Sequence, residues 1–451
     1  MSSPVPAYFD EFILALGAAL LRSGYSVADV QPRLREVIDA YGVTDLSLSV
    51  LPNLVLLDDG RRTRSRTVDM AGQHRMDQAM AVVTVMRAAQ AAEITPEEGL
   101  RRLVGALALP RRFPEWISFL GYAAMAAGFA LMFGASLIGV ALSFGLGLGV
   151  GIIMHIARPY PVLTQLIPPL IAFLTSLVVF AVGGVQDGLE PARLVAAPLV
   201  ALIPGMALTA GTLELAGGHI ISGASRLVWG IMQLILIASG IVAGAYAARV
   251  DAWNLSDQGS ITTPAWFALI GVLVVAIGQL LYFNEPAGIV KWLVPLLLLA
   301  FMVQTIAGVI VGSIASGGVA AAIILPIALQ IERRRRGMAP PALITFQPVF
   351  WLLVPGSLGV LGLTEALING MGGNSDLSAA GFLFAMAGGI LAIVLGTQIG
   401  SLIGWAFTRV TEVVPEMVLR AVGAFQPDAT PEHPAPPAPP APPAADRRAS
   451  D

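Results

Sequence analysis

The stretch IPGMALTAGTLEL, from Ile203 to Leu215, decides how the chain is interpreted. It lies within an apolar run long enough to cross a membrane, yet it holds Pro204 and Gly205 side by side and has Glu214 near its end. Proline removes a backbone hydrogen bond from a helix, and glycine lets the backbone open. Freed backbone groups are tolerated at membrane depth only where protein or a wet cavity satisfies them. The stretch therefore predicts an interrupted membrane helix.

The composition is that of an integral membrane protein. Of 451 residues, 56% are hydrophobic and 12% are charged, and the mean hydropathy is +0.77. Soluble globular chains carry about 25% charged residues. There are no cysteines, which excludes disulfides and thiolate metal sites. The net charge of −3 gives no indication of a nucleic-acid partner.

The charges are concentrated at the amino-terminal end, where residues 1–115 contain 13 of the 26 basic residues. This pattern predicts a small α+β soluble domain. Residues 8–22 and 27–41 have apolar residues at helical spacing, and LSLSVLPNLVLL resembles strands. Thr95-Pro96-Glu97-Glu98 is a helix start with Thr as the amino-cap and Glu98 closing a capping box. We interpret RRTRSR, residues 61–66, as a solvated loop rather than a lipid or regulator site.

A membrane-spanning helix needs about 20 apolar residues. This criterion predicts an all-α polytopic membrane region with ten transmembrane helices. The expected spans are 116–134, 136–156, 163–183, 194–214, 226–248, 264–283, 290–307, 309–330, 347–369 and 379–407.

The basic residues of short loops predict the orientation, because cytoplasmic loops are enriched in Lys and Arg. Eight of them lie on the side of the amino terminus and only Arg193 and Arg249 lie on the other. We expect a cytoplasmic (inner) membrane protein with both termini in the cytoplasm and no cleaved signal peptide. The expected parts are a soluble domain (1–115), two membrane halves (116–250 and 251–410) and a disordered Pro-rich cytoplasmic tail (411–451).

A second Pro-Gly motif repeats the first. VPGSLGVLGLTEAL contains Pro355 and Gly356, and Glu365 follows its proline by the same ten residues as in the first motif. The two motifs fall in the expected spans 4 and 9, which are equivalent positions of two five-helix halves. Because five is odd, the two spans run in opposite directions, which is the arrangement of a 5+5 inverted repeat.

Broken helices at matching positions predict a midplane substrate site, where the amino termini of half-helices attract an anionic group. The alternative is that each proline merely shapes packing. The candidate substrate-binding residues are Pro204, Gly205, Met206, Thr209, Thr212, Pro355, Gly356 and Ser357.

Glu214 and Glu365 are the acidic residues that we place within spans, and they are candidates for proton coupling or gating. His155 and His219 could help to relay protons. The simpler interpretation is that the glutamates are solvated at the interface and the histidines are hydrogen-bonded anchors.

The chain resembles the threonine/serine exporter family. The resemblance is carried by LIPGMALTAGTLELAGGHIISGASRLVWG, in which Ser222, Gly223 and Arg226 form the Ser-Gly-x-x-Arg of the family. It extends to LLRSGYSVADVQPRLREVIDAYG, LPRRFPEWISFLGYAAMAAGFALMFGAS and ALQIERRRRGMAPPALITFQPVFWLLVPGS. Arg226 joins the gating candidates on this ground. The long Pro-rich tail is a departure that the family does not require.

The resemblance implies ten spans and proton-driven efflux of threonine and serine. The partners are then the amino acid substrate, protons and the lipid bilayer, with a homo-oligomer left open. A dicarboxylate exporter is an alternative, because some relatives are thought to export dicarboxylates, and a membrane sensor that binds a ligand without moving it is another. We expect no enzyme activity and no cofactor or metal, because no HExxH or GxSxG motif occurs and Lys291, the only lysine, lies outside any Walker motif.

Overall fold

The computed structural model describes residues 8–68, 74–160, 166–183, 191–249, 264–285, 287–334, 346, 349, 351–353, 388–389, 391–404 and 406. By its contacts, the chain divides into one unit from Met1 to Gly404 and a second from Trp405 to Asp451. The account below concerns the first unit. Residues 354–369 of the expected span 9, residues 379–387 of the expected span 10 and the tail 411–451 lie outside the described residues.

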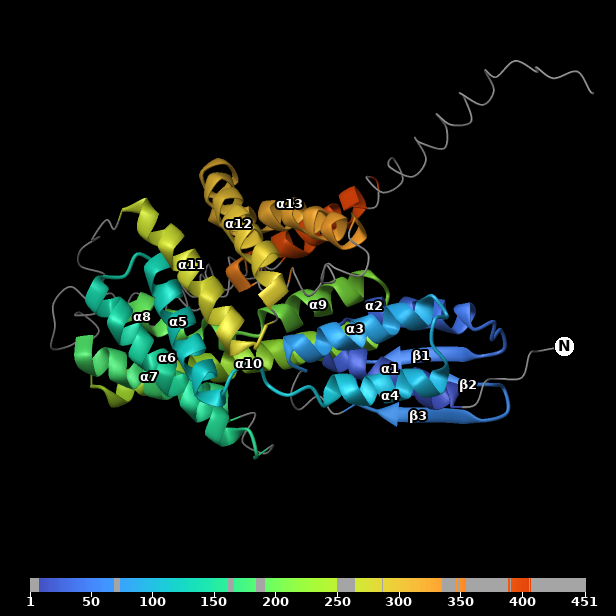
Figure 1. Cartoon of the computed structure of the whole chain (residues 1–451). Coiled ribbons are helices and arrows are strands. Elements are labelled where there is room, and N and C mark those ends of the chain that lie inside the picture. Colours follow the sequence, from blue (N-terminus) through green and yellow to red (C-terminus); the bar gives the residue numbers. More distant parts are fainter. Residues whose placement is uncertain are drawn as a thin grey trace, which may run out of the picture. The chain divides into compact units, whose positions relative to one another are not determined.

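The described residues of the amino-terminal part form four helices and a three-stranded antiparallel sheet in the order β1-β2-β3. Helix α1 packs on β2 and β3 and on α2, α3 and α4 (Figure 1). Its core is formed by fully buried side chains such as Phe12 and Leu16 of α1 and Leu34 of α2. The elements are α1 Phe9–Arg22, α2 Val27–Ala40, β1 Ser47–Leu51, β2 Leu54–Asp58, β3 Thr63–Thr67, α3 Met76–Gln90 and α4 Pro96–Leu107.

The local signals predicted most of this part. The two helices, the β1–β2 hairpin and the Thr95 cap are confirmed, since Thr95 Oγ1 accepts the N–H of Glu98. Two expectations were wrong. Residues 63–67 form the exposed strand β3 rather than a loop, because they extend the ladder of β2. The Glu98 carboxylate does not close a capping box but pairs with Arg101 and Arg102.

The remaining described elements are mainly apolar helices. Five of them are long and apolar enough to cross a membrane: α5 Glu115–Met132, α6 Leu137–Ala157, α10 Ile220–Ala247, α12 Val290–Val311 and α13 Ser313–Arg334. Shorter apolar helices are α7 Ile167–Gly183, α8 Pro191–Leu199, α9 Gly205–Ala216, α11 Ala265–Tyr282 and the helix Leu391–Gly404. The short 3-10 helices η2 Val200–Leu202 and η4 Ala287–Ile289 precede α9 and α12.

Glycines allow the closest helix contacts, as is usual where helices pack in a membrane. Helices α5 and α11 cross in antiparallel fashion (Figure 1). A Cβ added at Gly121 would lie 2.6 Å from the backbone nitrogen of Tyr282, and one at Gly128 would lie 2.8 Å from the carbonyl oxygen of Gly271. The two helices therefore touch backbone to backbone.

The expected boundary between spans 7 and 8 was wrong. We placed the turn between spans 7 and 8 at Gly308, but α12 continues to Val311 and the chain turns at Gly312. Gly312 has φ +86°, a conformation that glycine adopts without steric cost.

Candidate functional site

The first Pro-Gly motif interrupts the helix, as predicted. Helix α8 ends at Leu199 and gives way to η2, and Ile203 then takes extended backbone angles (φ −70°, ψ 129°). Helix α9 begins at Gly205, and both Pro204 and Gly205 are buried. Because the first N–H groups of a helix lack partners within it, the start of α9 offers buried donors.

The predicted substrate-binding residues are only partly described. The Thr212 hydroxyl donates to the carbonyl oxygen of Leu208 one turn earlier (3.0 Å). The side chains of Met206 and Thr209 are not described. The second motif, with Pro355, Gly356, Ser357 and Glu365, lies outside the described residues.

Glu214 is fully buried, and its carboxylate has three partners among the described residues. One oxygen accepts the backbone N–H of Val27 at 2.9 Å. The other accepts the hydroxyl of Ser222 and lies 3.1 Å from Nε of Arg226. We call Glu214, Ser222, Arg226 and Val27 the Glu214 cluster. The simpler interpretation of Glu214 as a solvated interfacial residue is therefore wrong.

The position of Val27 explains why a buried carboxylate is stable there. Val27 is the first residue of α2, and the preceding Ser26 caps that helix by accepting the N–H of Asp29. An anion is favoured at a helix amino terminus, because the aligned peptide dipoles and the unpaired N–H groups point toward it. Arg226 supplies the opposite charge, without which a buried carboxylate is costly.

A tight hairpin brings Ser222 and Arg226 to Glu214. Gly218 turns the chain with φ +82° between α9 and α10. A Cβ at Gly223 would lie 2.6 Å from the carbonyl oxygen of Gly211, so the two helices pack closely. Helix α10 begins at Ile220, six residues before the expected start of span 5, and its first two turns therefore carry the family-like Ser-Gly-x-x-Arg residues.

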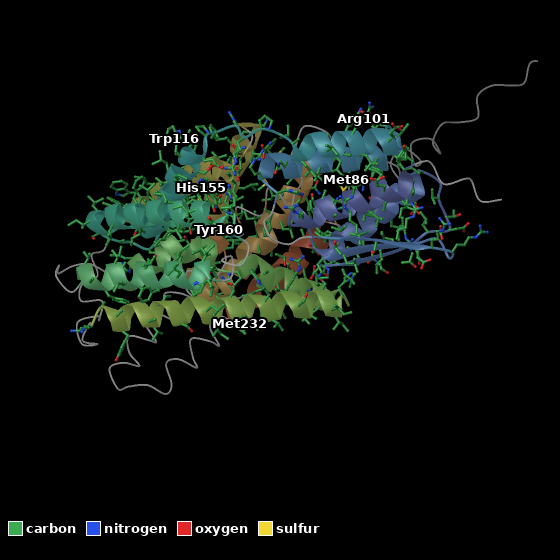
Figure 2. All side chains as sticks on the ribbon, turned by 90° about the horizontal axis from the view of Figure 1, so that it is seen from below. Met86, Arg101, Trp116, His155, Tyr160 and Met232 are labelled. Atoms are coloured by element: carbon green, nitrogen blue, oxygen red, sulfur yellow. The ribbon has the colours of Figure 1, made fainter. Side chains whose placement is uncertain are left out.

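The two histidines occupy different places. His219 is the residue before α10, and its backbone N–H donates to the carbonyl oxygen of Glu214 at 2.8 Å. His155 lies near the end of α6 (Figure 2). It belongs to another cluster, in which its Nε2 lies 3.3 Å from the carboxylate of Glu115. Glu115 also pairs with Arg111 (3.2 Å) and Arg158 (3.7 Å).

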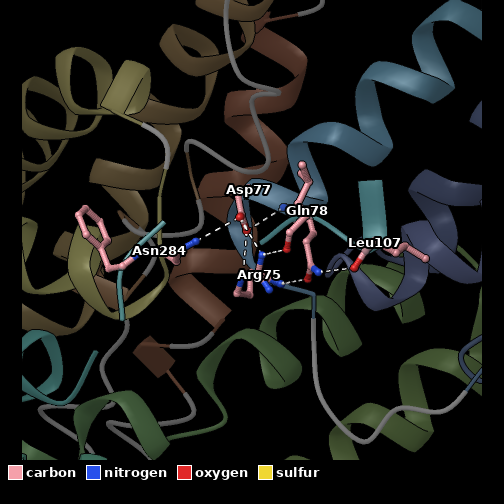
Figure 3. A network of polar contacts seen from close by, with 7 residues as sticks. Arg75, Asp77, Gln78, Leu107 and Asn284 are labelled. Carbon is pink, nitrogen blue, oxygen red and sulfur yellow. Dashed lines mark hydrogen bonds and ion pairs between the residues drawn. The ribbon is translucent and has the colours of Figure 1, made fainter. Parts of the chain in front are cut away.

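A second polar network was not predicted from the sequence (Figure 3). The Asp77 carboxylate accepts Nε of Arg75 at 3.1 Å and the side-chain amide of Asn284 at 3.1 Å. Asn284 follows α11 with φ 55° and accepts the N–H of Phe113 at 3.0 Å. The one sequence signal was an asparagine immediately after an apolar helix, since asparagine tolerates left-handed angles.

The candidate spans and the similarity to membrane proteins described below make the chain a multi-pass membrane protein. A family model described as "Putative threonine/serine exporter" matches residues 11–247. Because this match covers more than half of the 451 residues, the chain belongs to the threonine/serine exporter family.

Two curated relatives illustrate the similarity. A "Probable threonine/serine exporter" of Mycobacterium tuberculosis is 24% identical over 270 residues, which cover 55% of this chain and 47% of that protein. "Pheromone-regulated membrane protein 10" of Kluyveromyces lactis is 29% identical over 177 residues, which cover 37% of this chain and 18% of that protein. The chain thus spans less than half the length of these relatives. No solved structure matches it.

Proposed function

We propose that the chain exports threonine and serine across the cytoplasmic membrane, driven by the proton gradient. Family membership supports the substrate class. The observation that carries the mechanism is the interrupted helix, in which α9 begins at the buried Gly205 after the break at Ile203–Pro204. In this proposal both termini, residues 1–115 and the tail 411–451 are cytoplasmic.

The substrate carboxylate binds the amino terminus of α9 near Gly205 and Met206, where the peptide dipoles favour an anion. The equivalent position in the second half is Gly356–Ser357. The side chains proposed to contact the hydroxyl or amino group of the substrate are Thr209, Thr212 and Ser357. Thr212 uses its proton within its own helix, so it serves as an acceptor toward the substrate amine.

The proposal includes a 5+5 inverted repeat (116–250 and 251–410), and α5 and α11 support it. Both helices have 18 residues and can be compared without a gap: EWISFLGYAAMAAGFALM and AWFALIGVLVVAIGQLLY. Tryptophan is second in each, and glycine is seventh and fourteenth. These glycines meet crosswise in the antiparallel contact, Gly121 with Gly278 and Gly128 with Gly271. A pair of equivalent helices that pack on each other in this way is expected at a pseudo-two-fold axis.

A second pair of contacts has the same pattern. Helix α10, the fifth of the first half, packs on α7, the third, so that a Cβ at Gly244 would lie 2.5 Å from the carbonyl oxygen of Phe173. The tenth expected helix, Leu391–Gly404, packs on α13, the eighth, where a Cβ at Gly400 would lie 3.2 Å from the carbonyl oxygen of Ala321. The third and fifth helices of each half thus approach through glycine.

Glu214 is the proposed proton-coupling residue, with Arg226, His219, His155 and Glu365 as further gating candidates. A proton taken up by Glu214 would cancel its charge, and the attraction to Arg226 and to the amino terminus of α2 would weaken. Helix α9, which carries the substrate position at its other end, would then be free to move against α10 and α2.

The test uses purified protein in liposomes loaded with labelled threonine, with an imposed pH gradient. We compare wild type, Glu214→Gln and the control Glu97→Gln, which changes an exposed glutamate at the start of α4. Gradient-dependent efflux is expected in wild type and control, with loss in Glu214→Gln to the level of protein-free liposomes.

Other outcomes separate the alternatives. Efflux of succinate without efflux of threonine would show that the protein is a dicarboxylate exporter. Saturable threonine binding without flux would make the protein a sensor. Equal threonine efflux in wild type and Glu214→Gln would keep the exporter and refute the role of Glu214 in coupling.

A further inference from the structure

A hydroxyl group from a neighbouring helix contacts the interrupted helix just before its break. Tyr122 of α5 is 1% exposed, and its hydroxyl donates to the carbonyl oxygen of Pro198 at 2.9 Å. Pro198 is the penultimate residue of α8, which η2 and the break at Pro204–Gly205 follow. The last carbonyl groups of a helix have no partner within that helix. The Tyr122 hydroxyl therefore satisfies a carbonyl group that the end of α8 leaves free.

The neighbours of Tyr122 fix the direction of its ring. The ring meets that of Tyr282, at the end of α11, edge to face, with the two centroids 5.2 Å apart and an angle of 77° between the planes. Two glycines of α6 pack on the same residue. A Cβ at Gly147 would lie 3.2 Å from the carbonyl oxygen of Tyr122, and one at Gly151 would lie 3.5 Å from its Cβ. A ring packed this closely has little freedom to turn, so its hydroxyl stays directed at α8.

Tyr122 also lies at the contact between the two proposed membrane halves. It follows Gly121, the glycine of α5 that packs on the backbone of α11, and α5 packs on α8 as well (Figure 1). The hydrogen bond thus ties the end of α8 to the helix pair at the proposed pseudo-two-fold axis. Groups of a binding site must be held to within about 0.5 Å by residues that packing itself locks in place. Tyr122 meets this requirement at the break.

A buried tyrosine hydroxyl needs a partner wherever it lies, so the bond alone is also consistent with ordinary packing. The neighbouring Tyr282 allows the two interpretations to be compared. Its hydroxyl lies 3.8 Å from Sδ of Met154, a weak acceptor that belongs to α6 and not to the interrupted helix. The two tyrosines therefore pack on each other but differ in whether the hydroxyl contacts the break.

We propose that Tyr122 is a positioning residue of the substrate site, whose hydroxyl holds the carboxyl end of α8 in place relative to the start of α9. This role rests on the proposed exporter function, because it concerns the same substrate position. Tyr122 acts through the backbone of α8 and not by contact with the substrate. Without the hydroxyl, the carbonyl group of Pro198 loses its partner, the geometry of the break loosens and the substrate binds more weakly.

The first measurement is threonine efflux from proteoliposomes over a series of internal threonine concentrations. The variants are Tyr122→Phe and the matched control Tyr282→Phe, each of which removes one hydroxyl and keeps the ring. In Tyr122→Phe the KM should rise about tenfold with little change in kcat, because one hydrogen bond that supports binding is lost. Tyr282→Phe should resemble wild type. A merely structural role would reduce the fraction of active protein, which lowers the kcat and leaves the KM unchanged.

The second measurement is hydrogen exchange of the backbone amides of residues 199–206 in the purified full-length protein without substrate. These amides should exchange about tenfold faster in Tyr122→Phe than in wild type or Tyr282→Phe, because the end of α8 opens more easily. This measurement requires no transport. Absence of threonine efflux in wild type would therefore refute the proposed substrate, whereas the exchange rates would still decide whether Tyr122 anchors the break.

Two results would overturn the positioning role. One is equal exchange of residues 199–206 in Tyr122→Phe and Tyr282→Phe. The other is an unchanged KM in Tyr122→Phe when wild type transports threonine. Should Tyr122→Phe not fold, Tyr282→Leu keeps the Tyr122 hydroxyl but removes the ring that holds it. The KM and the exchange rates should then be higher in Tyr282→Leu than in Tyr282→Phe, and equal values would likewise refute the role.

Discussion

The carboxylate of Glu214 and the backbone N–H of Val27 are hydrogen-bonded at 2.9 Å although 187 residues separate them in the chain. Val27 begins a helix of the amino-terminal part, and Glu214 lies near the end of the helix that follows the Pro-Gly break. A change in the charge of this one carboxylate therefore acts on two regions of the protein together. This relationship gives the amino-terminal part a direct physical connection to the proposed substrate position.

Removal of Arg226 should destabilise the protein strongly. Arg226→Gln leaves the buried Glu214 carboxylate without its counter-charge, and breaking a buried ion pair in this way costs about 3–5 kcal/mol. The double variant Glu214→Gln/Arg226→Gln should be more stable than Arg226→Gln alone, because the unpaired charge is gone. Chemical denaturation of the purified proteins measures both. If the effects of the two single substitutions simply add, the two residues are not coupled.

The contact between Gly211 and Gly223 should be intolerant of a methyl group. Gly223→Ala places a Cβ 2.6 Å from the carbonyl oxygen of Gly211, so α9 and α10 must separate and the Glu214 cluster must loosen. We expect a lower melting temperature and loss of threonine efflux. The matched control is Gly149→Ala in α6, where nothing lies within 4 Å of the new Cβ. That change should be neutral or stabilise by up to about 1 kcal/mol, because alanine favours a helix. Equal behaviour of the two variants would contradict the close contact.

Patterns within short stretches of sequence predicted the helices, whereas the partners of the site residues depend on tertiary contacts. Hydropathy gave α5 and α6 to within two residues at each end, and the Pro-Gly pair predicted the break before α9. These features depend on residues that are neighbours in the chain. The partners of Glu214 could not be predicted in the same way, because Val27 donates through its backbone and any residue could supply that N–H.

Helices α5 and α11 share a sequence pattern that did not by itself predict their relationship. The shared tryptophan and two glycines are visible in the printed sequence, yet two helices of 18 residues with few identities do not identify each other. The contact between the two helices explains the matching glycines, because only glycine lets the two backbones approach this closely.

Acid should destabilise the protein through His74. Burial and the charge of Arg22 lower the pKa of His74 from 6.5 to about 4. Between pH 6.5 and 4 the imidazole of His74 therefore binds a proton in the unfolded chain but not in the folded chain. The stability of the fold falls as the pH decreases through this window. After a discount for solvent screening, the effect is on the order of 1 kcal/mol. In His74→Gln the melting temperature should fall less between pH 6.5 and 4 than in wild type. An identical pH profile would show that His74 does not carry this effect.

Glu285 should destabilise the protein as the pH rises, whereas His74 should destabilise it as the pH falls. It lies in the connection between α11 and η4, is 1% exposed, and neither carboxylate oxygen has a hydrogen-bond partner among the described residues. Burial raises its pKa from 4.5 to about 8. Between these values the folded chain holds a proton that the unfolded chain has released, so stability falls as the pH rises from 4.5 to 8 and then levels off.

Glu285→Gln removes that titration and keeps the shape of the side chain. At pH 8 the variant should therefore be more stable than wild type, on the order of 1–3 kcal/mol after the cost of a buried amide without partners. Near pH 4.5, where the glutamate is largely protonated, this advantage should disappear. Melting temperatures of the two proteins across pH 4.5 to 8.5 measure the difference, with Glu97→Gln on the exposed face of α4 as the control. A constant difference at every pH would mean that the carboxyl of Glu285 does not titrate in this range.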